Sequence, residues 1–505
     1  MELPDVRIER SENLVPKRIC IIGAGPAGLA ALKIILDTPQ YQSGAWVPVA
    51  YEARDQVGGV CKKRLPALST ADDLPFSPLY DSLTTNLPHP VMAYTSFPFP
   101  PETPVFPPAR VVETYLKSYA KNFNLLPHIQ LNTSVDTVER LTDGQGQWKV
   151  KLSSEQIEVF DFLIVCNGHY RVPRYPEIPG LESWRASNHA MHSAWYRRPT
   201  HKYGDKVLVI GAGPSGLDIS SEMAENGVTI IHSIRENRSE DLGNIKRRGS
   251  VIEFKDNGVV LFEDGTVEEG ISFCIIATGY ETTFPFLPEP AIIRNTLPPP
   301  IPPIPQSLYN STFHVFPLAK HIFPLGYTNP NIAFLGLLVR VAPFPLLEAQ
   351  ARATVHVFAN PSTLDYTREA VDIMSRYANL SSELASEDPL MIARVWHRFT
   401  DYEQFDYRDS LYEFSDASTQ EGITGIEGRI VVPDWEKKMY DAKGVLRQFW
   451  IYLEKEGLAE VWLRGVGKGG IHEWVELLER MLRDARGNGG ESVQEDTLDT
   501  DKSKL

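Results

Sequence analysis

A chain of 505 residues, with 42% hydrophobic and 23% charged residues, has the composition of an ordinary globular protein and is long enough for about three average domains. Its formal net charge of −15 argues against a general affinity for nucleic acid, because binding to phosphates needs concentrated Lys and Arg. The polar N-terminal residues lack the apolar core of a secretory signal, and no stretch approaches the length of a membrane-spanning helix. We therefore expect a soluble intracellular protein without a membrane span and without nucleic-acid partners.

A strand, a tight turn and a helix are predicted at residues 18–32, where the chain reads RICIIGAGPAGLAAL. The glycines match G-x-G-x-x-G, in which the first permits the turn, the second lets the backbone approach a pyrophosphate, and the third allows close helix packing. The next strand-like stretch ends at Glu52, where a carboxylate can accept hydrogen bonds from ribose hydroxyls. This pattern predicts a dinucleotide with a free ribose, FAD or NAD. The residues assigned to this site are Gly23, Gly25, Pro26, Ala27, Gly28 and Glu52.

Proline-rich loops, a helical stretch at residues 111–123 and a strand-like stretch at 161–168 complete the first unit, which we expect to span residues 1–194. Three of the four cysteines lie in apolar, strand-like stretches, and the chain has no C-x-x-C motif. We therefore expect small buried side chains in a reducing compartment, and no metal site. These cysteines are Cys20, Cys166 and Cys274.

A second strand, turn and helix are predicted at residues 207–220, VLVIGAGPSGLDIS, and belong to a second nucleotide-binding unit over residues 195–282. The strand that follows ends without an acid and instead offers Ser233, Arg235 and, nearby, Arg238. A cation at this place tolerates a 2′-phosphate, so the pattern predicts NADP with Arg235 on the phosphate. The alternative, in which these arginines are solvated surface charges, stays open. The residues assigned to this site are Gly211, Gly213, Pro214, Ser215, Gly216, Ser233 and Arg235.

The rest of the chain is predicted to return to the first unit. Residues 296–305 are rich in proline and indicate an extended connector, after which the apolar stretch NIAFLGLLVRV restores a buried strand. Apolar residues at helical spacing predict an amphipathic helix over residues 471–484. We expect the second part of the first unit at residues 283–486 and a disordered acidic tail at 487–505. The predicted fold class is α/β, with two Rossmann-like dinucleotide-binding domains, of which the FAD domain is discontinuous.

Six motifs follow one another along the chain: GAGPAG, YE…GGV, SPLYDSLTTNLPHPVMAYTSFPF, CNGHYRVP, GAGPSG and ATGYETTFPFL. This ordered set, over residues 17–355, resembles the flavin-containing monooxygenases, most closely the fungal and yeast type. The resemblance implies FAD in the first unit and NADPH in the second. Two dinucleotides of different type on one chain imply electron transfer between them, which a hydride makes only across van der Waals distance.

Asn86, in TTNLP at residues 84–88, matches the asparagine that the family places beside the reactive edge of the flavin. Its carboxamide can donate and accept at once, which suits holding a flavin hydroperoxide and the nicotinamide ribose. The alternative is an asparagine that satisfies a turn before Pro88. The resemblance also implies cofactor contacts from Gly59, Val60, Leu87 and Gln350.

The family signature F-x-G-x-x-x-H-x-x-x-Y/F is only half present. Aligning it on His192 and Tyr196 puts Ala186 and Asn188 where the family has Phe and Gly. The half that is present favours this family over the Baeyer–Villiger enzymes, whose signature has a tryptophan at that place; Trp195 lies one residue early. His192 could equally be a linker histidine that packs between domains.

The resemblance implies an enzyme that uses NADPH, FAD and O₂ to form a flavin hydroperoxide and to oxygenate an amine nitrogen or a sulfur of a small molecule, like an N,N-dimethylaniline monooxygenase. The alternatives are a Baeyer–Villiger-type monooxygenase, an NADPH-dependent flavoprotein reductase and a non-catalytic flavoprotein redox sensor. The incomplete signature and Cys61, which stands where the family usually has tryptophan, leave these alternatives open.

The last three residues, Ser503, Lys504 and Leu505, form the S-K-L peroxisomal address. They predict a peroxisomal location and an import receptor as a partner; the alternative is the cytoplasm. A homodimer is a further partner that the residues leave open.

Overall fold

The structure is a computed structural model and describes residues 15–61, 74, 77–141, 146–235, 239–327, 330–400, 402–415 and 431–488. Three predictions fall outside this description. They concern Arg238, the side chain of Cys61, and residues 489–505 of the tail with its terminal S-K-L; Gly487 and Asn488, which we expected in the tail, belong to the last helix.

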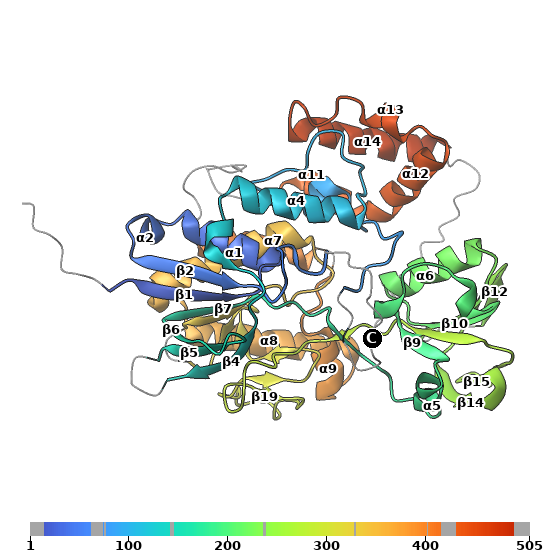
Figure 1. Cartoon of the computed structure of the whole chain (residues 1–505), viewed down its shortest axis with the longest axis horizontal. Coiled ribbons are helices and arrows are strands. Elements are labelled where there is room, and N and C mark those ends of the chain that lie inside the picture. Colours follow the sequence, from blue (N-terminus) through green and yellow to red (C-terminus); the bar gives the residue numbers. More distant parts are fainter. Residues whose placement is uncertain are drawn as a thin grey trace, which may run out of the picture.

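A parallel sheet in the order β24-β7-β1-β2-β3 forms the first unit among the described residues (Figure 1). Its strands are β1 (Lys17–Ile22), β2 (Trp46–Tyr51), β3 (Ile129–Gln130), β7 (Phe162–Val165) and β24 (Ile332–Phe334). Alternate residues of a strand point to opposite faces, so a strand that is buried on both faces is apolar throughout. Ile19 and Ile21 accordingly pack in one core with the helices α1 (Pro26–Leu36) and α7 (Pro343–Ala359). Cys20 and Ile22 pack in a second core on the other face.

The second core is covered by an antiparallel meander of β4 (Val135–Arg140), β5 (Trp148–Leu152) and β6 (Ile157–Phe160). Cys20, Cys166 and Cys274 are all buried, as the sequence predicted, and burial raises the pKa of each thiol well above its usual range.

The chain returns to the first sheet through β24, which pairs in parallel with β7 and places Ile332 opposite Leu163. The second unit lies between β7 and β24 in the sequence. The discontinuous first domain is therefore confirmed.

The second unit contains a sheet in the order β12-β13-β11-β10-β17-β9, as the described residues form it. Its strands are β9 (Ala190–His192), β10 (Lys206–Ile210), β11 (Thr229–Ser233), β12 (Glu240–Leu242), β13 (Ile245–Arg248) and β17 (Phe273–Ile276). The helix α6 (Pro214–Glu225) connects β10 to β11. A smaller antiparallel sheet joins β14 (Val251–Lys255), β15 (Val259–Phe262) and β16 (Val267–Glu268).

The second unit begins earlier than the sequence predicted. β9 pairs in parallel with β17, and Leu181 and Trp184 of helix α5 (Leu181–Ala186) pack into the core of this unit. The expected boundary between residues 194 and 195 therefore falls inside the second unit. A strand of three residues carries too little periodicity to be recognised in a sequence.

Two extended segments carry the chain between the units. β8 (Val172–Pro173) leads into the second unit and β18 (Tyr280–Glu281) leads out of it, and the two pair as an antiparallel ribbon. Arg174 fastens this ribbon, because its guanidinium donates to the Tyr280 carbonyl and to the carbonyl of Thr312 at 3.3 and 2.8 Å.

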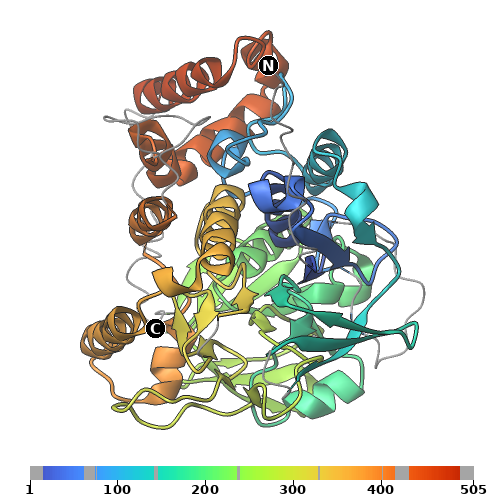
Figure 2. The ribbon, with the colours of Figure 1, turned by 90° about the vertical axis from the view of Figure 1, so that its left-hand side faces the viewer.

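Helices form most of the C-terminal part of the described chain. They are α8 (Tyr366–Leu384), α9 (Pro389–Val395), α10 (Glu403–Phe414), α11 (Asp434–Asp441), α12 (Lys443–Lys455), α13 (Ala459–Leu463) and α14 (Ile471–Asn488). α12 to α14 form a separate layer at one end of the molecule (Figure 2). The helix predicted at residues 471–484 is α14, and Trp474, Leu478 and Leu482 on its apolar face are buried.

The remaining α-helices and strands lie in the connections between these elements. They are α2 (Pro39–Gln42), α3 (His89–Met92), α4 (Ala109–Asn122), β19 (Ile293–Arg294), β20 (Tyr309–Asn310), β21 (Val315–Phe316), β22 (Leu318–Ala319) and β23 (Phe323–Pro324). Among the described helices, none combines the length and the apolar character that crossing a bilayer requires.

Candidate active site

The first glycine loop turns the chain from β1 into α1. Gly23 has a φ of +100°, and a Cβ there would lie 2.6 Å from the carbonyl oxygen of Cys166. A Cβ on Gly28 would lie 1.9 Å from the carbonyl oxygen of Gly23, so both positions admit only glycine. Gly25 is the N-cap of α1, no described side chain caps the helix, and its first turn has no acid. The first N–H groups of α1 are therefore left for an anion such as a pyrophosphate.

Glu52 follows β2 and lies beside this loop, as the sequence predicted for a ribose-binding carboxylate. Its Oε2 accepts from the Ala24 N–H at 2.9 Å, and its Oε1 accepts from the Arg54 N–H at 3.0 Å. Only 7% of the residue is exposed. Two backbone donors thus orient the carboxylate, and each oxygen keeps a lone pair for a ribose hydroxyl.

Residues 58–60 fold back over the first loop and enclose it. The Gly58 N–H donates to the Ala24 carbonyl at 3.1 Å, and a Cβ on Gly59 would lie 3.1 Å from the Cα of Gly25. The guanidinium of Arg54 donates to the carbonyl of Gly59, and the carbonyl of Val60 accepts from the Ser77 hydroxyl at 2.8 Å. Gly59 therefore lies against the first loop, and the cofactor contacts expected of Gly59 and Val60 stay predictions.

The second glycine loop repeats the geometry of the first. Gly211 has a φ of +120°, and a Cβ there would lie 2.4 Å from the Ala277 carbonyl oxygen, while a Cβ on Gly216 would lie 1.9 Å from that of Gly211. Gly213 is the N-cap of α6, which again has no acid in its first turn and no cap from a described side chain. A Cβ added to Gly213 would have no described heavy atom within 4 Å other than those of its chain neighbours. Gly213 and Pro214 are also exposed.

The two loops thus differ in exposure, since Gly25 and Gly28 are buried and Gly213 is open to solvent. An enclosed loop suits a group that stays bound, and an open loop suits a coenzyme that is exchanged in each cycle.

The end of β11 lies beside the second loop. His232, which the sequence analysis did not single out, uses its Nε2 to donate to the Gly211 carbonyl at 2.9 Å, and burial lowers its pKa. The Ser233 hydroxyl is buried and donates to the Gly249 carbonyl at 2.9 Å. Arg235 lies just beyond the strand and is exposed. Of the two residues assigned to the NADPH site at this strand end, Arg235 is therefore the one on the surface.

Asn86 lies on a segment that contacts both units; we call residues 77–94 the strap. Near its start, the Tyr80 hydroxyl donates to Asp218 Oδ2 on α6 at 2.7 Å. At its end, the Tyr94 hydroxyl donates to the Pro26 carbonyl in the first turn of α1 at 2.7 Å. Leu87 is buried in the core that also holds α1, whereas Asn86 is exposed. The strap therefore carries Asn86 on the stretch of chain that runs from the second glycine helix to the first.

Residues 16–239 and 237–392 match a protein family described as flavin-binding monooxygenase-like. The chain belongs to the flavin-containing monooxygenase family. It is 29% identical to human flavin-containing monooxygenase 2 over 442 residues, which cover 71% of this chain and 77% of the human protein. It is 30% identical to the Arabidopsis thaliana flavin-containing monooxygenase FMO GS-OX-like 1 over 388 residues, covering 72% and 77% of the two chains.

Solved structures of related enzymes share the fold. S-allyl-L-cysteine S-oxygenase from Allium sativum superposes with a TM-score of 0.68 at 24% identity and covers 94% of this chain and 99% of its own. The enzyme Tmm from a Pelagibacter species gives a TM-score of 0.65 at 20% identity, covering 86% and 91%. FAD and NADPH are thus the cofactors of this monooxygenase, and the two uncapped glycine helices fit their pyrophosphates.

His192 and Tyr196, the half of the family signature that is present, hold the connection between the units. His192 Nδ1 accepts from the Ala194 N–H at 3.1 Å, and Nε2 donates to the Gly279 carbonyl at 3.0 Å. Burial lowers the pKa of His192 to about 4, so the ring is neutral near pH 7. The Tyr196 hydroxyl donates to Glu222 Oε2 on α6 at 2.6 Å. His192 is therefore a buried packing residue at the end of β9 in the second unit, and not a linker residue between the domains.

Asn188, which stands where the family signature has glycine, keeps the backbone conformation that glycine favours. Its φ is +58°, in the left-handed region that Asn tolerates better than other non-glycine residues. Ala186, in place of the family's Phe, ends the short helix α5. A glycine could therefore replace Asn188 without a change of this backbone conformation.

Replacing Asn188 tests this explanation. We expect Asn188→Gly to leave the melting temperature and the activity close to those of the wild type. Asn188→Val should lower the free energy of unfolding by about 1–2 kcal/mol, because a β-branched residue is strained in the left-handed region. Thermal and urea unfolding of both variants measure the difference, and a Val variant as stable as the Gly variant would contradict it.

Gln350 and Glu348 on α7 are fully buried. The Gln350 amide accepts from the Gly336 N–H and donates to the Tyr407 hydroxyl, both at 3.0 Å, so it shapes the turn after β24; a direct contact with the flavin stays a prediction. The sequence analysis missed Glu348, whose carboxylate accepts from the Thr95 N–H at 2.7 Å and from the Ser96 hydroxyl at 2.6 Å. An acid within the apolar run PFPLLEAQA is the signal that could have found it.

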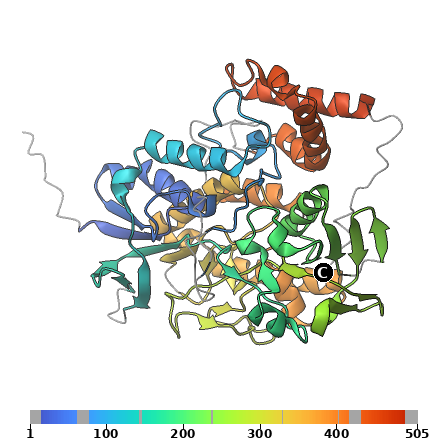
Figure 3. The same cartoon turned by 45° about the vertical axis from the view of Figure 1, so that its right-hand side comes forward.

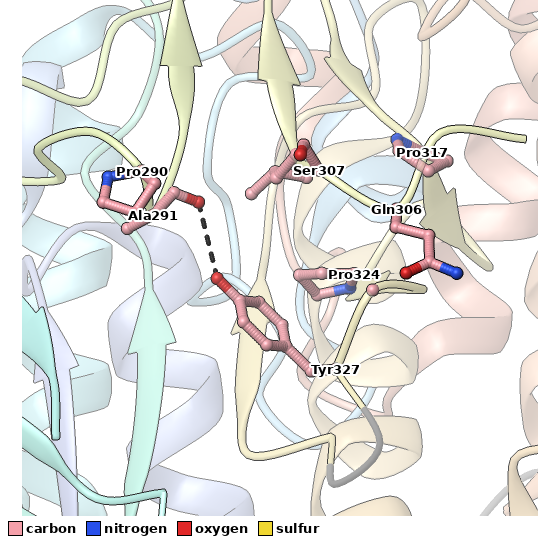
Figure 4. A pocket seen from close by; sticks show the side chains of 9 residues that line it. Pro290, Ala291, Gln306, Ser307, Pro317, Pro324 and Tyr327 are labelled. Carbon is pink, nitrogen blue, oxygen red and sulfur yellow. Dashed lines mark hydrogen bonds between the residues drawn. The ribbon is translucent and has the colours of Figure 1, made fainter. Parts of the chain in front are cut away.

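A small cavity of about 140 Å³ lies among the loops that follow β18, away from both glycine loops (Figure 4). Its lining includes Pro290, Gln306 and Tyr327, and the Tyr327 hydroxyl donates to the Ala291 carbonyl at 3.4 Å. Binding sites for drug-sized ligands usually measure about 300–1,000 Å³. The cavity is therefore too small for a dinucleotide.

Exchanging Glu52 tests the first site. Glu52→Ala should lower FAD occupancy of the purified protein, because the adenosine ribose loses an acceptor that two backbone donors hold in place. Each hydrogen bond to a charged group contributes roughly 1.5–3 kcal/mol, so we expect FAD affinity to fall at least tenfold. Glu155→Ala, an exposed acid of the first unit, is the control. Unchanged FAD affinity in Glu52→Ala would remove Glu52 from the site.

Proposed function

We propose that this flavin-containing monooxygenase oxygenates the sulfur or the amine nitrogen of a small molecule. The reaction consumes one NADPH, one proton and one O₂ and releases NADP⁺ and water, while the substrate gains one oxygen atom. FAD, which the first glycine loop and Glu52 would hold, would supply the redox chemistry for hydride uptake and for activation of O₂.

The observation that carries the proposal is the position of Asn86. The strap fastens this residue between the helix that receives the NADPH pyrophosphate and the helix that receives the FAD pyrophosphate. Its neutral amide can donate one hydrogen bond and accept another without transferring a proton. Such a group is suited to orienting the species that delivers the oxygen atom. The oxygen transfer needs no nucleophilic side chain from the protein, and the strap and Asn86 have the task of excluding water and directing hydrogen bonds.

The substrate class is supported by what related proteins act on. One is named as an S-allyl-L-cysteine S-oxygenase and others as N-oxide-forming dimethylaniline monooxygenases. Both reactions deliver oxygen to a soft nucleophile with a free electron pair.

Oxygenation under ¹⁸O₂ tests the proposal. Purified protein loaded with FAD is given NADPH and, in separate reactions, an aliphatic thioether, a tertiary amine and a cyclic ketone. We expect one ¹⁸O atom in the sulfoxide or the N-oxide and little lactone. Lactone as the main product would replace the proposal by a Baeyer–Villiger reaction. NADPH oxidation by quinones under nitrogen, without oxygenated product in air, would favour the reductase, and no turnover at all would favour the redox sensor.

We further propose that the enzyme is peroxisomal and is carried there by an import receptor that recognises Ser503, Lys504 and Leu505. A fluorescent protein ending in residues 487–505 should collect in peroxisomes, and the same fusion without Leu505 should be diffuse. Diffuse fluorescence from the intact tail would leave the enzyme in the cytoplasm.

We also propose that the enzyme forms a homodimer. α12 and α13 expose the apolar side chains of Val445, Tyr452 and Val461, which a second copy could cover. Sedimentation velocity measures the oligomeric state, and a monomer at micromolar concentration would rule out a stable dimer.

A further inference from the structure

Two acids one turn apart on α6 are each bound by a tyrosine hydroxyl. Tyr80 of the strap donates to Asp218 Oδ2 at 2.7 Å, and Tyr196 donates to Glu222 Oε2 at 2.6 Å. The two rings meet edge to face with their centroids 5.9 Å apart, inside the core of the second unit. Burial and the nearby Asp218 raise the pKa of Tyr80, so its phenol keeps the proton that it donates. The strap is therefore fastened to the helix that begins at the second glycine loop.

Arg447 reaches the same acid from the C-terminal helices. It lies on α12, and its Nη2 is 3.4 Å from Asp218 Oδ1 and 3.5 Å from Oδ2. The Arg447 and Asp218 side chains are 26% and 25% exposed, so solvent screens this ion pair only in part. α12 lies above α6 in two views of the molecule (Figure 1, Figure 3). Asp218 thus joins three segments that are distant in the sequence.

The C-terminal helices are also fixed to the first unit. The Trp474 ring of α14 packs edge to face on His89, just beyond Asn86, with 4.3 Å between the centroids. Glu102 Oε1 accepts from the Gly465 N–H at 3.0 Å and lies 3.1 Å from Lys468 Nζ. The C-terminal helices therefore contact two parts of the molecule. On one side they contact the strap and the residues that follow it, and on the other side they contact α6 of the second unit.

We propose that Arg447 is a positioning residue for hydride transfer from NADPH. Through Asp218 it holds α6, and with it the second glycine loop, at a set distance from the first unit. Asp218 lies one turn from Pro214, where α6 begins, so a shift of this acid moves the backbone that receives the NADPH pyrophosphate. A hydride passes only between atoms in van der Waals contact, and a misplacement of about 1 Å can cost about a hundredfold in rate. The proposal rests on FAD reduction by NADPH and does not depend on the oxygenated substrate.

Arg447→Gln is the central variant, and it is compared with Lys455→Gln, which removes an exposed positive charge from the same helix. Stopped-flow mixing with NADPH under nitrogen measures the rate of flavin reduction and the apparent Kd for NADPH separately. We expect the rate to fall roughly tenfold in Arg447→Gln with little change in Kd, because a positioning contact acts on geometry and not on binding. Arg447→Lys should recover part of the rate. Lys455→Gln should behave as the wild type.

Hydrogen exchange of the FAD-loaded protein without NADPH supplies a readout that is independent of activity. We expect faster exchange in α6 and in the first residues of the strap in Arg447→Gln, and a melting temperature within about 2 °C of the wild type, as for a partly exposed ion pair. Asp218→Asn should produce the same changes, and the double variant with Arg447→Gln should add little to either single one. If Arg447→Gln matches Lys455→Gln in reduction rate and in exchange, Arg447 is not a positioning residue.

Discussion

Asn86→Ala is expected to separate NADPH consumption from oxygen transfer. The loss of one preorganised hydrogen-bond donor typically costs about 3 kcal/mol, on the order of a hundredfold, at the step that the donor serves. Retention of FAD should survive, because the residues that we expect to bind FAD, Gly23 to Gly28 and Glu52, are not altered. Flavin reduction by NADPH should survive as well, since α6 and the second glycine loop are not altered.

The variant should therefore oxidise NADPH and release H₂O₂ in place of oxygenated substrate. The measurement is the ratio of sulfoxide or N-oxide to NADPH oxidised, with H₂O₂ determined in parallel. Ser82→Ala, which removes an exposed polar group elsewhere on the strap, is the matched control and should keep the wild-type ratio. If Asn86→Ala also keeps that ratio, Asn86 is a turn residue before Pro88 and does not direct the oxygen transfer.

The sequence predicted those parts of the site that depend on local backbone constraints. Gly23 and Gly211 need a positive φ, and Gly28 and Gly216 need room for a carbonyl oxygen, so each glycine loop carries its own geometry in a few residues. Glu52 could be predicted because it lies at the end of the strand that follows the helix of the first glycine loop. The discontinuous first domain followed from a single apolar stretch, which β24 confirms.

Contacts between residues far apart in the sequence could not be predicted. Tyr80, Asp218 and Arg447 meet although α6 and α12 are separated by more than two hundred residues, and nothing in the local pattern marks them as partners. The sequence likewise does not predict in which direction a polar side chain at the end of a strand points. Ser233 was assigned to the NADPH site, yet its hydroxyl donates inward to the carbonyl of Gly249, which lies just beyond the neighbouring strand β13.

Residue type and backbone conformation also diverge at one place. Asn188 makes the family signature incomplete as a string of letters, but its φ of +58° lies in the left-handed region, which glycine also adopts.

Arg235 is the residue from which we expect the preference for NADPH over NADH. The neighbouring Arg248 lies opposite Ser233 on β13, but its guanidinium is buried and bound by Glu268 and Asp241 at 2.7 and 2.8 Å. Arg235, just beyond the same strand end, is exposed beside the open second loop. A guanidinium in this place can donate two parallel hydrogen bonds to a phosphate, which NADPH has on its ribose and NADH lacks.

Arg235→Gln should therefore raise the KM for NADPH by roughly ten- to a hundredfold, since hydrogen bonds between charged groups contribute roughly 1.5–3 kcal/mol and each 1.4 kcal/mol is tenfold in affinity. The KM for NADH should change by less than about twofold, because NADH never made the contact. Lys255→Gln, which removes an exposed charge from β14 of the same unit, controls for the change in net charge. Raising the salt concentration should reduce the difference in KM for NADPH between the wild type and Arg235→Gln, because salt screens an exposed ion pair. Equal losses with both coenzymes would mean that Arg235 supports the loop and does not bind the 2′-phosphate.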